Sequence, residues 1–370
     1  MTSSAAVIVG ARRTPITSAG HQLRSHDIEH LTAPVLARLH QDLIHLGLSD
    51  VEINDVIIGV ARDRGGNPAR RAILAAGLDQ SIPGATVDRQ CGSGLDAIAI
   101  AAGHVSFGAS CVIAGGAESA STGPTGRSAF APEGFPDPDM GVAAQYLADQ
   151  RGIERPRQDA YARQSHNRAM SAADNGVFDD EIAAIDGIVR DSRPRELKPE
   201  VMARMPGAFA EGGSISAANA CGVSDGAAAV VMVSDSIAQQ HQLSGLLIRG
   251  IARVGINPAE PALGPVSAIT RLLTESSLTL DSIDRIEITE AFAGQMCAIF
   301  DDLALSDSDP RVCADGGALA LGHPWGASGA VLMVRLFSAL VTHDQGRLGL
   351  AACAIAGGQG IAVLVERVQP

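Results

Sequence analysis

A faint internal repeat is the feature of this 370-residue chain that most limits its fold. Three pairs of segments carry the repeat: 55–59 with 284–288, 91–94 with 323–329, and 111–116 with 354–358. Repeats of this kind indicate an architecture built from similar units that pack against each other. Two similar halves would place Cys91 and His323 at corresponding helix entrances, and a pseudo-twofold axis would make those entrances face one another.

Short apolar, β-rich runs alternate with helical patterns, which predicts an α/β fold with largely buried strands. The expected strands are 7–9, 56–60, 111–114, 230–233, 246–248, 286–288 and 348–355. The expected helices are 32–46, 95–103, 159–175 and 329–340, and Pro34 is expected in the first turn of the earliest one. Between about 119 and 214, Pro, Arg, Asp and Gly concentrate, so we interpret this stretch as an excursion from the core.

Composition and charge exclude several classes of partner. The formal net charge is −13 and no local basic stripe interrupts it, which argues against nucleic acid. No apolar run approaches the roughly 18 residues that a membrane-spanning helix needs. The six cysteines form no CxxC pair and no signal peptide precedes them, so we expect reduced thiols in a soluble, cytoplasmic protein.

Three short motifs have both a functional and an ordinary interpretation. Residues 92–97 match a relaxed GxGxxA dinucleotide fingerprint, but the first strand-to-helix turn, where it normally lies, is 10–15. Residues 222–226 match the GxSxG nucleophile turn, yet a strand-like run follows instead of a helix. Residues 26–30 match the HxxEH zinc pattern, but a solvated helix start explains them better, and no metal site is expected.

Cys91 and His323 are the two residues best suited to chemistry. A thiol at a helix N-terminus meets free backbone N–H groups and the positive end of the helix dipole, which should lower its pKa. Gly92 and Gly94 leave room for a substrate to approach, although a buried, inert cysteine is the alternative. His323 lies between Gly322 and Pro324 and is a poor core residue. A cysteine nucleophile with a histidine base is the pairing used in acyl transfer.

At these residues the chain resembles the thiolase family, which makes and breaks carbon–carbon bonds in acyl-CoA thioesters. The resemblance spans nearly the whole chain, with the motifs in the family's order. They are 13–15 (RTP), 67–70 (NPAR), 91–95 (CGSGL), 115–119 (GGAES), 219–228 (NACGVSDGAA), 290–293 (EAFA), 316–324 (GGALALGHP) and 357–360 (GGQG).

The resemblance implies two fused α/β halves in a five-layered core, with an inserted loop domain over the CoA site. The implied domains are 1–118, the first part of the N-terminal half; 119–214, the loop domain; 215–243, the completion of the N-terminal half; and 244–370, the C-terminal half. It also implies acyl-CoA substrates, no permanently bound cofactor, and a homodimer or homotetramer. Local arginines in the loop region suit the phosphates of CoA.

The resemblance also assigns roles to single residues. Cys91 would accept the acyl group, and His323 would activate it and later help to hold a thioester oxygen. The residues expected to contact CoA are Met140, Arg204, Ala217, Cys221, Ala291 and Phe292. The resulting prediction is a thiolase-type acyl-CoA C-acyltransferase, catalysing Claisen condensation or thiolytic cleavage of 3-oxoacyl-CoA.

The chain departs from the family pattern at positions that matter for the second half of the reaction. Thr289 stands where the family has an oxyanion-hole Asn, and Cys221 where it has a CoA-contacting Ser. The family's second catalytic cysteine aligns without a gap to Ala354, one residue after Cys353. Because neighbouring residues of a strand face opposite sides, Cys353 is expected to face away from Cys91. A thiolase-fold acyltransferase or thioester hydrolase lacking that base, or a non-catalytic acyl-CoA-binding subunit, are therefore the alternatives.

Overall fold

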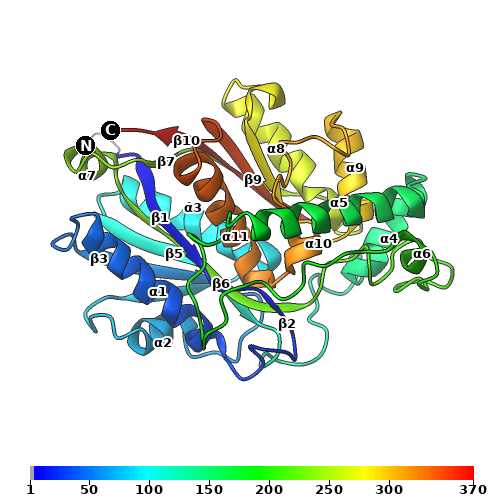
Figure 1. Cartoon of the computed structure of the whole chain (residues 1–370), viewed down its shortest axis with the longest axis horizontal. Coiled ribbons are helices and arrows are strands. Elements are labelled where there is room, and N and C mark those ends of the chain that lie inside the picture. Colours follow the sequence, from blue (N-terminus) through cyan, green and yellow to red (C-terminus); the bar gives the residue numbers. More distant parts are fainter. Residues whose placement is uncertain (1–3) are drawn as a thin grey trace.

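The structure is a computed structural model that describes residues 4–370, and it has an α/β architecture (Figure 1). The strands are β1 (Ala6–Arg13), β2 (Thr17–Ser18), β3 (Ile53–Gly59), β4 (Gly84–Val87), β5 (Cys111–Ser119), β6 (Ser224–Ser234), β7 (Gly245–Gly255), β8 (Arg285–Ile288), β9 (Leu348–Ile355) and β10 (Gln359–Val368). The helices are α1 (Ile28–His45), α2 (Pro68–Ala75), α3 (Ser93–Ser106), α4 (Met140–Gln150), α5 (Arg155–Asp174), α6 (Pro199–Met202), α7 (Asp235–Gln240), α8 (Gly264–Glu275), α9 (Ala293–Leu303), α10 (Ala318–Leu321) and α11 (Trp325–Phe337). Short 3-10 turns precede α3 (Gln90–Gly92) and α8 (Pro261–Leu263) and cover Leu280–Ser282, and a π-helical turn (Ser338–Thr342) extends α11.

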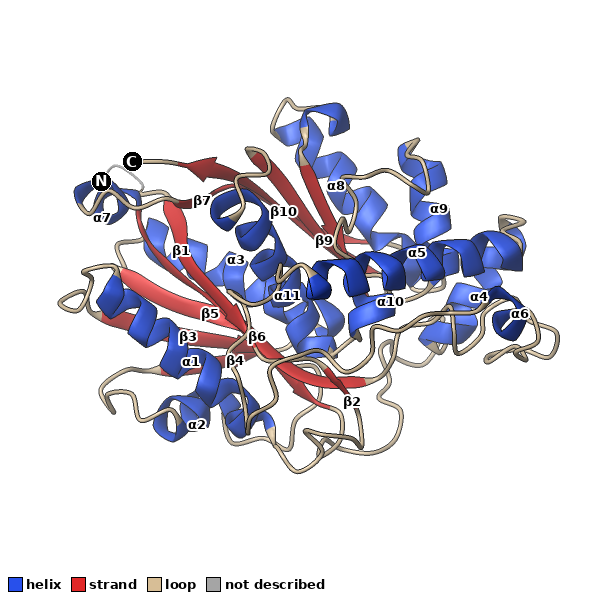
Figure 2. Cartoon of the chain, viewed as in Figure 1, coloured by secondary structure: helices blue, strands red, loops and turns tan. Residues whose placement is uncertain are grey.

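The strands form two half-sheets with the same order and direction. The full order is β4-β3-β5-β6-β1-β7-β10-β9-β8, with β2 pairing to β6 (Figure 2). In the first half β3 and β5 are parallel and β6 and β1 follow antiparallel, and in the second half β8, β9, β10 and β7 repeat this arrangement. Only two residue pairs join β1 to β7. The duplicated α/β architecture predicted from the repeat is confirmed, and β4 is an additional edge strand.

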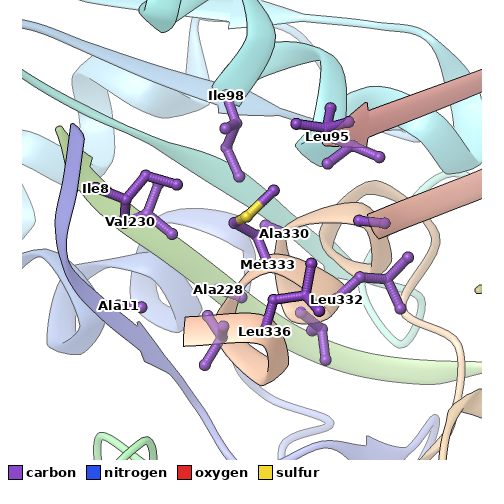
Figure 3. Packing of buried hydrophobic residues seen from close by; sticks show 14 of the residues in the cluster. Ile8, Ala11, Leu95, Ile98, Ala228, Val230, Ala330, Leu332, Met333 and Leu336 are labelled. Atoms are coloured by element: carbon purple, nitrogen blue, oxygen red, sulfur yellow. The ribbon is translucent and has the colours of Figure 1, made fainter. Parts of the chain in front are cut away.

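Three buried apolar clusters divide the molecule into five layers. The central cluster packs α3 and α11 between the two half-sheets, and Figure 3 shows side chains of both helices against β1 and β6. A second cluster packs α1 and α2 on the outer face of the N-terminal half-sheet. A third packs α8 and α9 on the outer face of the C-terminal half-sheet. Both half-sheets are therefore covered on each face, which explains why the strands read as near-continuous apolar runs.

The central layer depends on glycines where α3 and α11 cross. A Cβ atom on Gly94 would lie 2.7 Å from the Gly326 carbonyl oxygen and 2.9 Å from the Ala330 nitrogen. A Cβ atom on Gly329 would lie 2.6 Å from the backbone nitrogen of Leu95. Real Cβ atoms do not approach backbone this closely, so only glycine allows the two helix starts to pack together. This contact brings the segments that carry Cys91 and His323 side by side, as the repeat predicted.

A buried ion-pair network joins the first half, the inserted segment and α11. Glu181 accepts a hydrogen bond of 2.6 Å from Arg13 and also pairs with Arg335, and all three side chains are almost completely buried. Asp191 pairs with Arg13 at 2.7 Å. Phe178 lies between the two guanidinium groups, 5.3 Å and 4.8 Å from them. Removing one partner would leave a buried charge uncompensated, so the network fixes how the inserted segment attaches.

The expected strands all lie in or at the edge of observed strands, and each expected helix overlaps an observed one. The first helix differs, because α1 begins at Ile28 and Pro34 therefore lies inside it. Asp27 caps the helix by accepting a hydrogen bond from the His30 nitrogen, which fixes the earlier start. The excursion between β5 and β6 contains α4, α5 and α6.

The expectation that no apolar run reaches membrane-spanning length is wrong for one helix. Residues Trp325–Thr342, which are α11 and its π-helical extension, form an 18-residue window with a mean hydropathy of 1.4. This window is 78% buried inside the protein, between the two half-sheets. Its apolar composition is that of a central core helix, which is hydrophobic on every side because it is covered on every side.

Two glycines of α3 provide a test of the crossing. Gly94→Ala should lower the free energy of unfolding by about 1–3 kcal/mol, because the added methyl group overlaps the backbone of α11. Gly103→Ala is the matched control: a Cβ there meets nothing within 4 Å, and the change should raise stability by about 0.5–1 kcal/mol. Urea denaturation followed by circular dichroism measures both. Equal effects of the two changes would contradict the proposed role of Gly94.

Candidate active site

Cys91 lies in the short 3-10 turn immediately before α3, and its side chain is half-buried. The preceding residue, Gln90, adopts a left-handed backbone conformation with φ of 48°, which is uncommon for a residue with a side chain. Its backbone nitrogen donates to Asp88 at 2.7 Å, and the Ser93 hydroxyl donates to its carbonyl oxygen at 2.6 Å. A sharply bent, hydrogen-bonded turn therefore holds the predicted nucleophile at the helix entrance.

The protonation state of Cys91 differs from the sequence-based expectation. Burial raises the pKa of the Cys91 thiol well above its usual value, and the nearby Cys353, Cys221 and Glu118 groups raise it further. A backbone hydrogen bond lowers the pKa by less than these effects raise it. The prediction of a lowered pKa is therefore wrong for the free site, because the loss of hydration outweighs the helix terminus. The thiol is protonated near neutral pH and requires a base.

His323 is buried and neutral. Burial lowers the pKa of its imidazole to about 4. Its Nδ1 atom lies 2.6 Å from the Ser328 hydroxyl, and that hydroxyl donates its single proton to the Pro324 carbonyl oxygen at 2.9 Å. A proton on Nδ1, donated to Ser328, satisfies both contacts at once, and this tautomer leaves Nε2 with a free lone pair. This tautomer suits a general base.

The strand segment after Cys221 holds the His323 loop in place. The His323 backbone nitrogen donates to the Gly222 carbonyl oxygen at 2.9 Å, and Val223 forms an isolated bridge with His323. Among residues 4–370, no hydrogen bond connects the Cys91 sulfur to the His323 ring. Contacts of this kind are often long before a substrate binds, so the arrangement is compatible with proton transfer in a complex.

Glu118 lies near the end of β5, and its carboxylate reaches the start of α11, close enough to Cys91 to affect its pKa. One of its carboxylate oxygens accepts hydrogen bonds from the Gly326 and Ala61 nitrogens, at 2.9 Å and 3.2 Å. The other oxygen is buried without a hydrogen-bond partner within the described chain. Burial raises the pKa of Glu118 to about 7, so this carboxyl group changes charge near neutral pH.

Cys353 does not face away from Cys91 as expected, and that prediction is wrong. Ala351, Cys353 and Ile355 share the face of β9 that packs against α3 and α11. A Cβ atom on Gly92 would lie 2.5 Å from Ile355, so this face points to the turn that carries Cys91. Strand alternation is regular, and the ungapped alignment selected the wrong face.

The two departures from the family pattern, Thr289 and Cys353, contact each other. The Thr289 hydroxyl lies 3.2 Å from the Cys353 sulfur, and both side chains are buried. Burial raises the pKa of Cys353 to about 12, while the hydrogen bond with Thr289 lowers it by a smaller amount. The two side chains therefore form a hydrogen-bonded pair, and Cys353 is close enough to Cys91 to raise its pKa.

Four of the six predicted CoA-contacting residues gather in one small apolar cluster: Met140, Cys221, Ala291 and Phe292. The other two, Arg204 and Ala217, are exposed and lie outside it. Phe209, which the sequence did not indicate, packs edge-to-face on Phe292 with ring centroids 5.7 Å apart.

Glu290 attaches the inserted segment to the site. Its carboxylate accepts hydrogen bonds of 2.6 Å from the Tyr161 and Ser165 hydroxyls, both on α5. Asn219 donates to Asp159 on the same helix at 2.7 Å. The loops that contain Cys221 and Phe292 are thus tied to α5.

The GxSxG motif takes its ordinary interpretation, and the HxxEH segment lies at a helix start where the ligand atoms of Asp27, Glu29 and His30 are within 4.8 Å of one another. Residues 222–226 lead directly into β6, with no helix after the turn. In the HxxEH segment, His30 bonds to Asp27 at 2.5 Å and His26 to Asp186 at 2.9 Å, as polar groups at a helix start.

Comparisons with known proteins agree with this geometry. Residues 6–236 match the N-terminal domain of thiolase, and residues 242–367 match its C-terminal domain. The chain belongs to the thiolase family. It is an acyltransferase of the thiolase type, and the predicted fold class is confirmed along with the family.

Individual relatives are similar over nearly their full length. A putative acetyl-CoA C-acetyltransferase, YhfS, of Bacillus subtilis is 40% identical, covering 98% of this chain and 99% of the relative. A beta-ketoadipyl-CoA thiolase of Acinetobacter baylyi is 37% identical with the same coverage. The crystal structure of the Bacillus anthracis acetyl-CoA acetyltransferase superimposes with a TM-score of 0.91 at 32% identity, covering 99% of this chain and 100% of that one.

Proposed function

We propose that this thiolase transfers acyl groups through a thioester on Cys91, with His323 as the base that activates it. The observation that carries the proposal is the meeting of the two helix entrances at Gly94 and Gly326, which sets Cys91 opposite the His323 loop. A neutral imidazole with a free Nε2 lone pair is the protonation state that the role requires.

The first half-reaction follows from these protonation states. The Cys91 sulfur attacks the thioester carbonyl carbon of an acyl-CoA while His323 takes the thiol proton. The new S–C bond forms, the bond to the CoA sulfur breaks, and the CoA thiolate leaves and receives the proton. Because burial disfavours both the thiolate and the imidazolium, the proton transfer is coupled to bond formation and does not precede it.

For the second half-reaction, we propose that Cys353 removes a proton from the acetyl-CoA methyl group. Its face of β9 is the one directed at the Cys91 turn, and Thr289 donates a hydrogen bond that stabilises its thiolate. The carbanion attacks the acyl-Cys91 carbonyl in condensation, and thiolysis is the reverse. The competing outcome, a hydrolase or acyltransferase without this base, would leave acylation intact and abolish carbanion formation.

The apolar cluster of Met140, Cys221, Ala291 and Phe292 is our candidate for the pantetheine contact, with Phe209 as its cover. Arg204 is exposed on the inserted segment and Ala217 is exposed three residues after its end, and we assign both to the outer part of CoA. No permanently bound cofactor is required by this chemistry.

We further propose the division into 1–118, 119–214, 215–243 and 244–370, with 119–214 as a loop domain over the CoA site. The ties from Glu290 and Glu181 to this segment support treating it as one attached unit. A soluble, cytoplasmic homodimer or homotetramer remains our proposal for location and assembly.

The acyl-enzyme is the direct test of the proposed function. Intact-protein mass after mixing with acetyl-CoA or acetoacetyl-CoA should rise by one acetyl group, and Cys91→Ala should abolish this adduct while CoA binding persists. Cys221→Ser, which keeps Cys91 and changes a neighbouring thiol, should still form the adduct. The same adduct in Cys91→Ala would contradict the assignment.

Exchange of deuterium into the acetyl-CoA methyl group tests the second base. Cys353→Ala should lose exchange and condensation by about 100-fold or more, the usual scale for a missing general base, while acylation of Cys91 persists. Cys111→Ala is the control, because Cys111 is equally buried but lies in the outer cluster of the N-terminal half. Rapid exchange in Cys353→Ala would show that another group is the base.

A further inference from the structure

A pocket of about 330 Å³ opens at Cys91 and shares Met140 with the apolar CoA cluster. Gln90, Phe130, Met140, Trp325 and Arg62 are among its lining residues. A volume of this size lies in the range of small-molecule sites, and it far exceeds what an acetyl group fills. The pocket therefore has room for an acyl chain of several carbon atoms.

Arg62 brings to this pocket a positive charge that no ion pair neutralises within residues 4–370. Three of the lining side chains carry a formal charge: Arg62, Arg127 and Asp139. Arg127 is paired with Asp137 at 2.9 Å, and Asp139 caps α4 by accepting from the Gly141 nitrogen at 2.9 Å. Within residues 4–370, Arg62 has no carboxylate within ion-pair distance.

The position of Arg62 is fixed by contacts that leave part of its guanidinium free. Its Nη2 donates to the Pro124 and Gly126 carbonyl oxygens, the latter at 2.7 Å. Its central carbon lies 5.4 Å from the ring centre of Trp325, two residues after His323. A guanidinium has five N–H donors, so those on Nε and Nη1 have no protein acceptor within the described chain.

Within residues 4–370, none of the neighbouring acidic groups forms an ion pair with Arg62. Behind Arg62, in the hollow on its other side, Glu29 and Asp63 pair with Arg71, and Asp27 pairs with His30. Glu118 is close enough for Arg62 to lower its pKa, but the two form no ion pair: one Glu118 oxygen accepts from the Ala61 and Gly326 nitrogens, and the other has no hydrogen-bond partner within the described chain. Arg62 is thus held in place while its charge remains available to a ligand.

We propose that Arg62 binds a carboxylate at the far end of the acyl chain, so that the preferred substrates are CoA thioesters of dicarboxylic acids. This inference rests on the proposed function, because the acyl chain occupies the pocket only when its carbonyl carbon is placed at Cys91 for attack. Arginine donors form strong, geometrically specific hydrogen bonds with carboxylates. Gln90, Phe130 and Trp325 then enclose the intervening methylene groups.

Matched pairs of CoA thioesters test the proposal. Succinyl-, glutaryl- and adipyl-CoA differ from butanoyl-, pentanoyl- and hexanoyl-CoA only in a terminal carboxylate instead of a methyl group. The rate constant for acylation of Cys91, followed by intact mass and CoA release, should be at least about 10-fold higher for the best dicarboxylic thioester than for its partner.

Variants separate charge recognition from a purely structural role. Arg62→Gln should lower acylation by the dicarboxylic series about 10- to 100-fold and leave the methyl-terminated series and acetyl-CoA within about twofold. Arg62→Lys should retain part of the preference for dicarboxylic thioesters, because lysine keeps the positive charge but lacks the planar guanidinium that binds a carboxylate through two N–H groups. Arg64→Gln is the control: Arg64 is exposed on the same loop, donates to the Thr122 carbonyl, and does not line the pocket.

The outcomes that overturn the proposal are distinct. Normal acylation by acetyl-CoA, with no preference for either series, overturns the carboxylate site alone. An equal loss for both series in Arg62→Gln assigns Arg62 to holding the 124–126 loop. If Cys91 accepts no acyl group from any thioester, the proposed function has failed and this inference fails with it.

Discussion

The close approach of α3 and α11 is the contact on which the rest of the molecule depends. Glycines at 94, 116, 326 and 329 let the backbones of the two halves touch where a single methyl group would collide with main-chain atoms. Each half alone would expose one face of its sheet and one side of its central helix. Packing the two helices together buries both (Figure 3). The contact of Gly94 with Gly326 also sets the turn that carries Cys91 beside the start of α11, which follows His323.

Burial then sets the chemistry at that site. Dehydration keeps the Cys91 thiol protonated and the His323 imidazole neutral, and it raises the pKa of Glu118 to about 7. A neutral site avoids the cost of holding a buried ion pair in the absence of substrate. The same dehydration strengthens hydrogen bonds to charge that develops during the reaction, since the surroundings have a low dielectric constant. The site is therefore suited to forming charge only while acyl transfer is under way.

Sequence reasoning predicted the architecture, which the structure confirms, and it proposed Cys91 and His323, because both leave local signals. The repeat predicted equivalent halves, and glycines around Cys91 and His323 marked the helix entrances. It failed at Cys353, because strand alternation says that neighbours face opposite sides but not which face meets α3. It also misjudged the Cys91 pKa, since the helix terminus is visible in sequence and burial is not. Three residues that the sequence did not indicate make their contacts elsewhere. Arg62 contacts the loop after β5 and Phe209 contacts the 289–292 loop, and only the fold brings these partners together. Ser328 contacts His323, five residues before it in the chain.

The pH dependence of Cys91 acylation tests the central claim most directly. Single-turnover CoA release from acetyl-CoA should be measured between about pH 4 and 8 in the wild type and in His323→Ala, with circular dichroism checking that both remain folded. Because the neutral imidazole persists down to about pH 4, the wild-type rate should fall only with an apparent pKa of about 4. Acylation in His323→Ala should be about 100-fold slower, and its rate should not show this fall at low pH. A wild-type rate that falls with an apparent pKa near the ordinary histidine value of about 6.5 would contradict the account, and so would an unchanged acylation rate in His323→Ala.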